Sequence, residues 1–284
     1  MAFLPRSRSL RSVSLSALSR RSAFRRPGPE ESPGTAAAAA LPPAGAGFVH
    51  SVLLDARDDQ RGTLMSVRLA GDPVRCPYGA HPETWFRGGA QRLTAADLLM
   101  YALVHLPALQ AGQGLELSGG EPLAQPEFTA SVLAAFKQAG VRTRVRTSGH
   151  AASALSPSVL DAADEVVLDL HAADERTSWA LHHRRAEPAL AFARRAAEHG
   201  VPLRMSYLLV PGVTDSPEAV ASAAHLGAEL DCPVELRPYA PVRRDVFQQL
   251  HLDPPRTAKA PGHAALGEAR ERFARAGARV AVAA

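Results

Sequence analysis

From Phe48 onward, hydrophobic positions recur with two different periods. Alternation, or a short apolar run, predicts a strand, whereas apolar residues three and four apart predict a helix. The predicted strands are 63–69, 114–118, 141–146, 165–170, 201–210, 234–239 and 278–282. The predicted helices are 93–109, 128–136, 157–163, 188–199, 216–230 and 264–276. Single helices between strands imply right-handed crossovers and a parallel sheet, so the chain is predicted to form a full or partial α/β barrel.

Several residues predict where these helices begin or end. Thr94 is a predicted N-cap, and Ser216 followed by Pro217 predicts the start of another helix. Gly140 and Gly200 stop the helices that precede them.

The loop Leu117–Pro122, with sequence LSGGEP, ends a predicted strand. Gly119 and Gly120 would let the backbone approach a ligand closely, because they carry no Cβ. Glu121 offers an acceptor for a cationic group, and Pro122 stiffens the exit. Since ligands bind at the carboxyl ends of strands in α/β folds, we expect a site here. The alternative is a tight turn without a ligand.

Residues 1–47 differ from the rest of the chain, 48–284, which we expect to form the barrel. Seven arginines precede the first acid, Glu30, and a Pro/Gly/Ala-rich stretch follows. This composition predicts a disordered basic leader and linker. If the leader is a transit peptide, the protein is mitochondrial or plastid. If the start codon is misassigned, we expect a cytoplasmic protein.

Charge and apolar content argue against nucleic-acid binding and against a membrane span. The net charge is +4, but without those seven arginines 25 basic residues face 28 acidic ones, a net of −3. We therefore expect no nucleic-acid partner. No run of eighteen apolar residues occurs, so we expect no membrane span. Two cysteines, Cys76 and Cys232, make no disulfide framework.

A series of short motifs occurs in a fixed order along residues 50–239. They are HS at 50–51, GxPxRCxY at 71–78, HPETW at 81–85, LSGGEP at 117–122, TSG at 147–149, DL at 169–170, VPGVTD at 210–215 and ELxPY at 235–239. In this order they resemble the activating enzymes of glycyl-radical enzymes, above all those of pyruvate formate-lyase. These enzymes belong to the radical S-adenosylmethionine superfamily. The resemblance implies a partial (β/α)6 TIM-like barrel, S-adenosylmethionine as cofactor and a glycyl-radical enzyme as partner.

The resemblance fails at the family's metal site. The family binds a [4Fe–4S] cluster through three cysteines spaced C-x3-C-x2-C, which leaves one iron open for S-adenosylmethionine. The matching positions here are Asp72, Cys76 and Gly79, so Cys76 is the one thiol left. Cys232 precedes its strand and should lie at the opposite end of the barrel. A site of Asp72, Cys76 and His81 is an alternative, although it lacks the sulfur ligands that such clusters favour.

Other positions divide between retained and altered. The resemblance implies cofactor binding by Gly119, Gly120, Glu121, Pro122, Ser148, Asp169 and Arg204. Arg146 stands where the family often has an acid, His171 replaces a lysine, and Ala240 replaces a histidine. His171 with Asp174, and His182 with His183, suggest a replacement metal site, but we interpret them as surface histidines.

These observations favour a degenerate, inactive homologue of a glycyl-radical-enzyme activating enzyme that retains binding of S-adenosylmethionine or a partner protein. The alternative is a working activase, an oxidoreductase, with an unusually ligated cluster. A third class, non-radical chemistry at the histidines, has no supporting constellation beyond these residues. No catalytic residue can be assigned from the sequence.

Overall fold

The computed structural model describes residues 45–56, 62–151, 157–255 and 259–283. The predicted leader up to residue 44 lies outside the described residues. The first strand begins at Ala46, so residues 46 and 47 belong to the sheet and not to the predicted linker.

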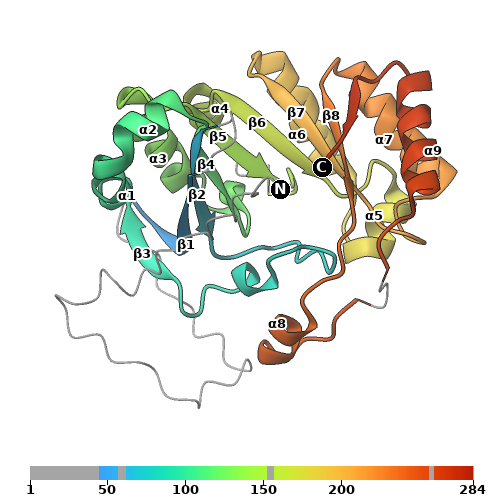
Figure 1. Cartoon of the computed structure of the whole chain (residues 1–284), viewed down its shortest axis with the longest axis horizontal. Helices are drawn as coiled ribbons and strands as arrows, with labels where there is room; N and C mark the ends of the chain where they lie inside the picture. The colour runs from blue at the N-terminus through green and yellow to red at the C-terminus, as the bar shows by residue number, and fades with distance from the viewer. Residues whose placement is uncertain (1–44, 57–61, 152–156, 256–258, 284) are drawn as a thin grey trace, which may run out of the picture.

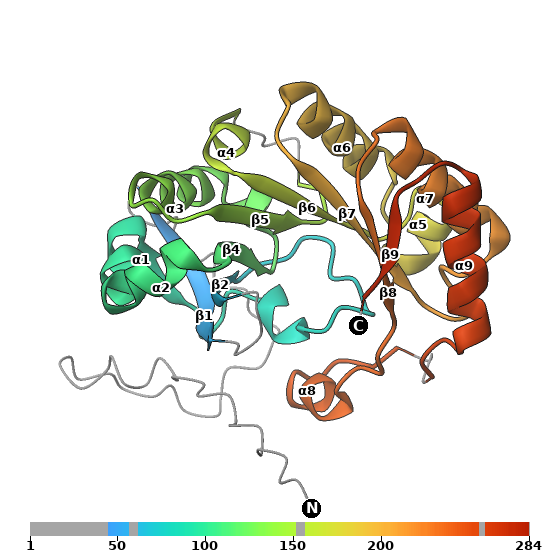
Figure 2. The same ribbon diagram turned by 45° about the horizontal axis from the view of Figure 1, so that its top comes forward.

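One mixed sheet organises the fold (Figures 1 and 2). Its strands run in the order β3-β1-β2-β4-β5-β6-β7-β8-β9. Along this order, each pair of neighbours from β2 to β9 is parallel. At the other end of the order, β1 pairs antiparallel with both β2 and β3. Because β3 and β9 lie at opposite edges, the described sheet is a partial barrel and not a closed one, as predicted. The strands are β1 Ala46–Ala56, β2 Thr63–Leu69, β3 Gln91–Thr94, β4 Gly114–Gly119, β5 Thr143–Thr147, β6 Glu165–Leu170, β7 Leu203–Leu209, β8 Val234–Pro238 and β9 Val280–Val282.

The helices that connect the parallel strands cover the outer face of the curved sheet (Figure 2). Thr94 caps α1 as predicted, in a reciprocal pair with Asp97, and Ser216 caps α7. The predicted helix 93–109 is instead divided into α1, a 3-10 turn and α2, because Pro107 has no N–H to continue the ladder. The helices are α1 Ala95–Ala102, α2 Leu106–Ala111, α3 Pro126–Gln138, α4 Pro157–Ala162, α5 Glu175–His182, α6 Glu187–His199, α7 Pro217–Glu229, α8 Arg244–Gln249 and α9 His263–Arg275.

The two faces of the sheet have opposite chemistry. On β4, Leu115 and Leu117 belong to the hydrophobic core, whereas Glu116 and Ser118 line the concave side. The same alternation on β5 buries Val145 in the core and turns Arg146 inward. The apolar core therefore lies between sheet and helices, and the inside of the partial barrel is polar.

Four elements were not predicted from the periodicity: β1, β3, α5 and α8. The short strand β3 and helix α8 have too few residues to show a period. Helix α5 buries Leu181 and His182 but leaves Trp179 exposed, so its apolar face is not evident from the sequence.

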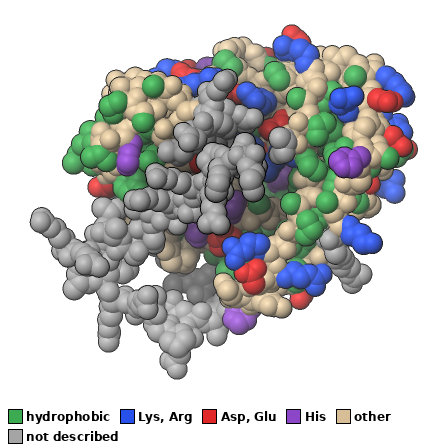
Figure 3. All heavy atoms as spheres, viewed as in Figure 1, with side chains coloured by type: hydrophobic (Ala, Val, Ile, Leu, Met, Phe, Trp, Pro, Cys, Tyr) green, Lys and Arg blue, Asp and Glu red, His purple; other side chains and the backbone are tan. Residues whose placement is uncertain are grey.

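Two surface features bear on the expected partners. Among the described residues, no helix has the length and apolar content needed to cross a membrane. On the face shown in Figure 3, the described Lys/Arg and Asp/Glu side chains are interspersed and form no continuous basic patch.

Candidate functional site

A cleft of about 650 Å³ opens at the carboxyl ends of the parallel strands. Cys76 and Gly120 both line it, so the loops after β2 and β4 meet at one rim, as the family resemblance implies. Its charged lining residues are Arg68, Asp72, Glu116, Glu121, Arg146, Asp169, Glu235 and Arg237, and His81 and His171 also contribute. The concave polar face and the strand-end loops therefore form one mixed-charge site.

The two glycines of the LSGGEP loop bring two backbones together. Gly119 has a φ of +98°, and a Cβ on Gly120 would lie 2.6 Å from the carbonyl oxygen of Gly71. Gly120 N donates to Leu69 O at 2.9 Å, and Glu121 N donates to Gly71 O at 2.9 Å. The close approach expected toward a ligand is thus, in this structure, an approach of the β4 loop to the β2 loop.

Glu121 is buried and holds the β4 and β5 loops together. Its carboxylate accepts hydrogen bonds from Leu123 N (2.9 Å), Thr147 Oγ1 (2.6 Å), Ser148 N (2.9 Å) and Ser148 Oγ (2.6 Å). Burial raises the pKa of Glu121, and these donors oppose the shift. The expectation that this side chain offers an acceptor to a cationic ligand is corrected, because four protein donors already engage its oxygens.

Pro122 and Ser148 have different positions relative to the cleft. Pro122 is buried at the start of a 3-10 turn, and its carbonyl accepts a hydrogen bond from Thr129. It does not belong to the cleft lining, whereas Ser148 does. The hydroxyl of Ser148 donates a hydrogen bond to Glu121.

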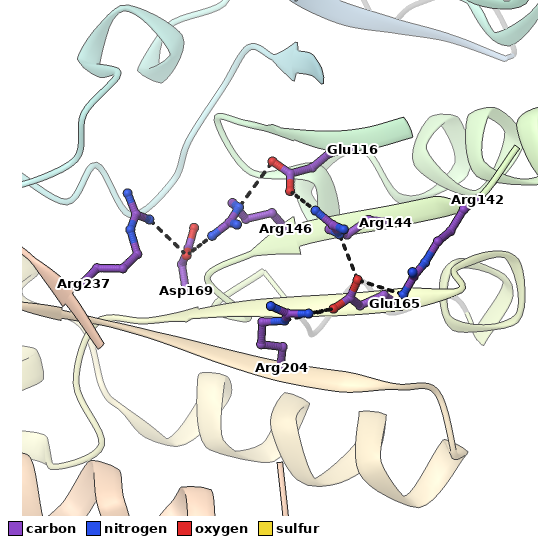
Figure 4. Close-up of polar contacts among 8 residues, drawn as sticks. All are labelled: Glu116, Arg142, Arg144, Arg146, Glu165, Asp169, Arg204 and Arg237. Atoms are coloured by element: carbon purple, nitrogen blue, oxygen red, sulfur yellow. Dashed lines mark hydrogen bonds and ion pairs between the residues drawn. The ribbon is translucent and has the colours of Figure 1, made fainter. Parts of the chain in front are cut away.

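Ion pairs cross the inside of the partial barrel from β4 to β8 (Figure 4). Arg146 Nη1 lies 2.8 Å from Asp169 Oδ1, and Arg146 Nε lies 3.4 Å from Glu116 Oε1. Arg237 Nη1 is 3.9 Å from the same Asp169 oxygen. Burial lowers the pKa of Arg146, but the two carboxylates outweigh this and raise it above its ordinary value. Asp169 therefore reaches the cleft as predicted, with Arg146 neutralising the charge that would face a ligand.

Arg204 lies at the other end of the barrel. Its guanidinium is 3.0 Å from Glu165, which also pairs with Arg144 at 3.0 Å (Figure 4). Arg204 and Cys232 line a separate hollow of about 400 Å³ at the amino-terminal ends of β6 to β8. The structure therefore separates Arg204 from the other predicted cofactor-binding residues, and it confirms the predicted position of Cys232.

The loop after β2 carries the three positions of the family's cluster motif. Asp72 Oδ1 accepts a hydrogen bond from Val74 N at 2.8 Å, and burial raises the pKa of Asp72. Cys76 is buried, and burial raises the pKa of its thiol to about 12. Gly79 donates its N–H to Cys76 O and has no side chain to offer. His81 Nδ1 is 3.0 Å from Glu83 Oε1.

The interpretation of the histidines as surface residues is wrong for two of them. His182 is buried and His171 lines the cleft, and both lie beside His150. His183 is exposed, as expected. His150 gives no signal in the sequence, because only folding brings the β5 and β6 loops together.

Comparisons with known proteins show the family of this chain. Residues 73–224 match the profile of the Radical SAM superfamily, which is more than half of the chain. The chain belongs to the radical SAM superfamily. It is 30% identical over 210 residues to the pyruvate formate-lyase-activating enzyme of Clostridium pasteurianum, covering 73% of this chain and 88% of that one. The pyruvate formate-lyase 1-activating enzyme of Escherichia coli is 28% identical over 184 residues, covering 64% of this chain and 74% of that one.

Solved structures support the radical SAM fold. A radical SAM methyltransferase from Sphaerobacter thermophilus superposes with a TM-score of 0.60 at 21% identity, covering 82% of this chain and 68% of the other. A domain of the pyruvate-formate lyase-activating enzyme from Bacteroides vulgatus gives a TM-score of 0.51 at 21% identity, covering 61% and 100%. At this identity the likeness concerns the fold alone.

Proposed function

We propose that this radical SAM protein is a catalytically inactive homologue of the glycyl-radical-enzyme activating enzymes, with a barrel that retains a binding cleft but not the cluster. The observation that carries the proposal is the donor set of the β2 loop: one thiol at Cys76, one carboxyl at Asp72 and no side-chain donor at Gly79. A [4Fe–4S] cluster is held by cysteine thiolates. These residues do not fit that group.

The environment of the remaining thiol supports the same conclusion. Metal ligation requires the thiolate, which forms readily where cations or backbone dipoles lower the cysteine pKa. Burial instead raises the pKa of Cys76 to about 12, and the charges of Asp72 and Asp169 add to the shift. Cys232 cannot complete the set from the opposite end of the barrel.

The cleft nevertheless suits a small ligand that carries charges of both signs. Guanidinium groups of Arg68 and Arg237 and carboxylates of Asp169 and Glu235 line the same space. S-adenosylmethionine combines an ammonium, a carboxylate and a sulfonium, so we propose that the cleft retains binding of this molecule. Gly119, Gly120, Glu121 and Ser148 would shape its wall, with Glu121 acting through the loops it joins.

A glycyl-radical enzyme is the proposed protein partner. The Clostridium pasteurianum and Escherichia coli relatives are named for activation of pyruvate formate-lyase. An inactive homologue that binds the same type of partner would act as a regulator.

Anaerobic reconstitution with iron and sulfide tests the missing cluster. We expect the wild-type chain to bind no four-iron cluster, measured as iron, acid-labile sulfide and the EPR spectrum after reduction. The matched variant Asp72→Cys/Gly79→Cys restores C-x3-C-x2-C, and we expect it to bind about four irons per chain. The Cβ that it adds at position 79 lies 3.1 Å from Cys76 O, which a small local shift accommodates.

Two results would contradict the proposal. About four irons and matching sulfide in the wild type, with an EPR spectrum altered by S-adenosylmethionine, would identify a working activase with an unusual ligand. Failure of the restored variant to bind a cluster would show that the missing thiols do not explain the loss. Calorimetry with S-adenosylmethionine on the unreconstituted chain tests the cleft separately.

A further inference from the structure

Three histidines from different elements converge beside the cleft. His150 follows the end of β5, His171 comes directly after β6, and His182 is the last residue of α5. One ring nitrogen from each lies within 4.8 Å of the other two. The ring centroids of His150 and His182 are 4.9 Å apart, and those of His171 and His182 are 5.4 Å apart. Adjacent parallel strands thus bring two histidines to one edge, and α5 supplies the third.

Most ring nitrogens of this cluster have no hydrogen-bond partner in the protein. Among the described residues, His150 Nε2, His171 Nδ1 and both ring nitrogens of His182 are buried and unpaired. Buried polar atoms in folded proteins almost always have a partner, so several unpaired nitrogens at one place favour a site that binds a water molecule or an ion.

The tautomer of His150 is suited to metal binding. His150 Nδ1 lies 3.2 Å from the carbonyl oxygen of Ser148, which can only accept a hydrogen bond. Nδ1 therefore carries the proton, and the buried Nε2 keeps a free lone pair. A ring nitrogen oriented by a backbone carbonyl on its far side is the usual support for a metal-bound histidine.

Charges around the cluster are of both signs. Asp72 faces His150 and Asp169 faces His171, and both favour a cation. Arg184 opposes one, and its guanidinium donates a hydrogen bond to the neutral carbonyl oxygen of Pro73 at 2.7 Å. The carboxylates stand on the side of the cleft, where His171 lies.

We infer that His150, His171 and His182 form a binding site for a divalent transition-metal ion, with Zn²⁺ as the ion that three neutral imidazoles and an open fourth position favour. Zn–N distances of about 2.0–2.1 Å in a tetrahedral site bring ligand nitrogens to roughly 3.3 Å from one another. The observed separations of up to 4.8 Å thus require the nitrogen–nitrogen distances to shorten by up to about 1.5 Å, which small χ rotations of the three rings can supply. The fourth position would hold water or a group in the cleft.

This site is independent of the cysteine motif. None of Asp72, Cys76 or Gly79 is among its ligands, and it needs no sulfide. The histidine site can therefore bind a metal ion whether or not the iron–sulfur cluster is present. Iron bound by the histidines would bring no acid-labile sulfide, which distinguishes it from a cluster.

Calorimetric titration of the untagged, chelator-treated full chain with Zn²⁺ tests the inference. We expect one ion per chain, a rise in the thermal midpoint on binding, and, with Co²⁺ as probe, the intense visible absorption of a four-coordinate site. His171→Gln and His150→Gln should each weaken Zn²⁺ binding by at least about 100-fold, since losing even an outer-shell partner costs about 10–100-fold. His225→Gln, at an exposed position on α7, is the matched control and should bind as the wild type does.

Far-UV circular dichroism of each metal-free variant verifies that it is folded, and the two single variants guard against a failure of either one. Absence of Zn²⁺ binding by the wild type would overturn the inference and leave the histidines as neutral packing residues. Unchanged affinity in both His171→Gln and His150→Gln would also overturn it, because the ion would then bind elsewhere.

Discussion

Gly120→Ala distinguishes a glycine that is needed for the fold from one that is needed for a ligand. The added Cβ would lie 2.6 Å from Gly71 O and 2.9 Å from its carbonyl carbon. A relaxed carbon–oxygen contact is about 3.3 Å, so the two loops must separate by roughly 0.7 Å. That movement stretches the 2.9 Å hydrogen bonds from Gly120 N to Leu69 O and from Glu121 N to Gly71 O.

The magnitude follows from these contacts. Overpacking of a tight site costs about 1–3 kcal/mol, and a weakened backbone hydrogen bond adds about 0.5–1.5 kcal/mol. We expect the free energy of unfolding to fall by about 2–3 kcal/mol, which lowers the thermal midpoint by roughly 5–10 °C for a domain of this size. Urea denaturation followed by circular dichroism measures the change as a shift of the midpoint concentration.

The control is Gly267→Ala. Gly267 lies within α9, and no heavy atom comes within 4 Å of its added Cβ. Alanine is the better helix former there, so we expect a gain of about 0.5–1 kcal/mol. A Gly120→Ala protein that is as stable as the wild type but no longer binds S-adenosylmethionine would refute the reasoning, because the glycine would then make room for the ligand.

Two further predictions concern the cleft. Arg146→Met removes the nearest counter-ion of Asp169 and one of the two arginines that pair with Glu116, so the free energy of unfolding should fall by about 2–3 kcal/mol. Arg275→Met in the exposed pair with Glu271 should change it by less than about 0.5 kcal/mol, and equal effects in urea denaturation would contradict a stabilising network. In a Cys232→Ser background, Cys76 should react with a thiol reagent at pH 8 at least about 100-fold more slowly in the folded than in the urea-unfolded protein, since its folded pKa is about 12. Because the folded state holds this proton more tightly, stability should fall as the pH rises above about 9, and rapid labelling at pH 8 would instead indicate a thiolate able to bind metal.

Much of the architecture follows from the sequence because it depends on local periodicity. Strand 165–170 was predicted with its observed bounds, and the caps Thr94 and Ser216 act as expected, since N-cap preferences are local. The family motifs also placed the loops at one rim, because parallel strands share their carboxyl edge. The leader up to residue 44 and its predicted disorder lie outside the described residues.

The role of each side chain depended on neighbours that are distant in the sequence. From the sequence alone, Glu121 is expected to be a free acceptor. In the fold, Thr147 and Ser148 lie within 3 Å of its carboxylate oxygens. The family resemblance implies that Arg204 contacts the cofactor. In the fold, Arg204 lies at the start of β7 and pairs with Glu165.

The sequence by itself therefore determined the family, the order of strands and helices, and the loss of two of the three cluster cysteines. Each of these features depends only on residue identity or on short-range spacing. Only the tertiary structure decided which side chains meet. His150, His171 and His182 come from three elements, and nothing in their spacing marks them as a set. Their convergence, like the ion pairs inside the barrel, results from strand register and helix placement, which bring residues together across tens of positions.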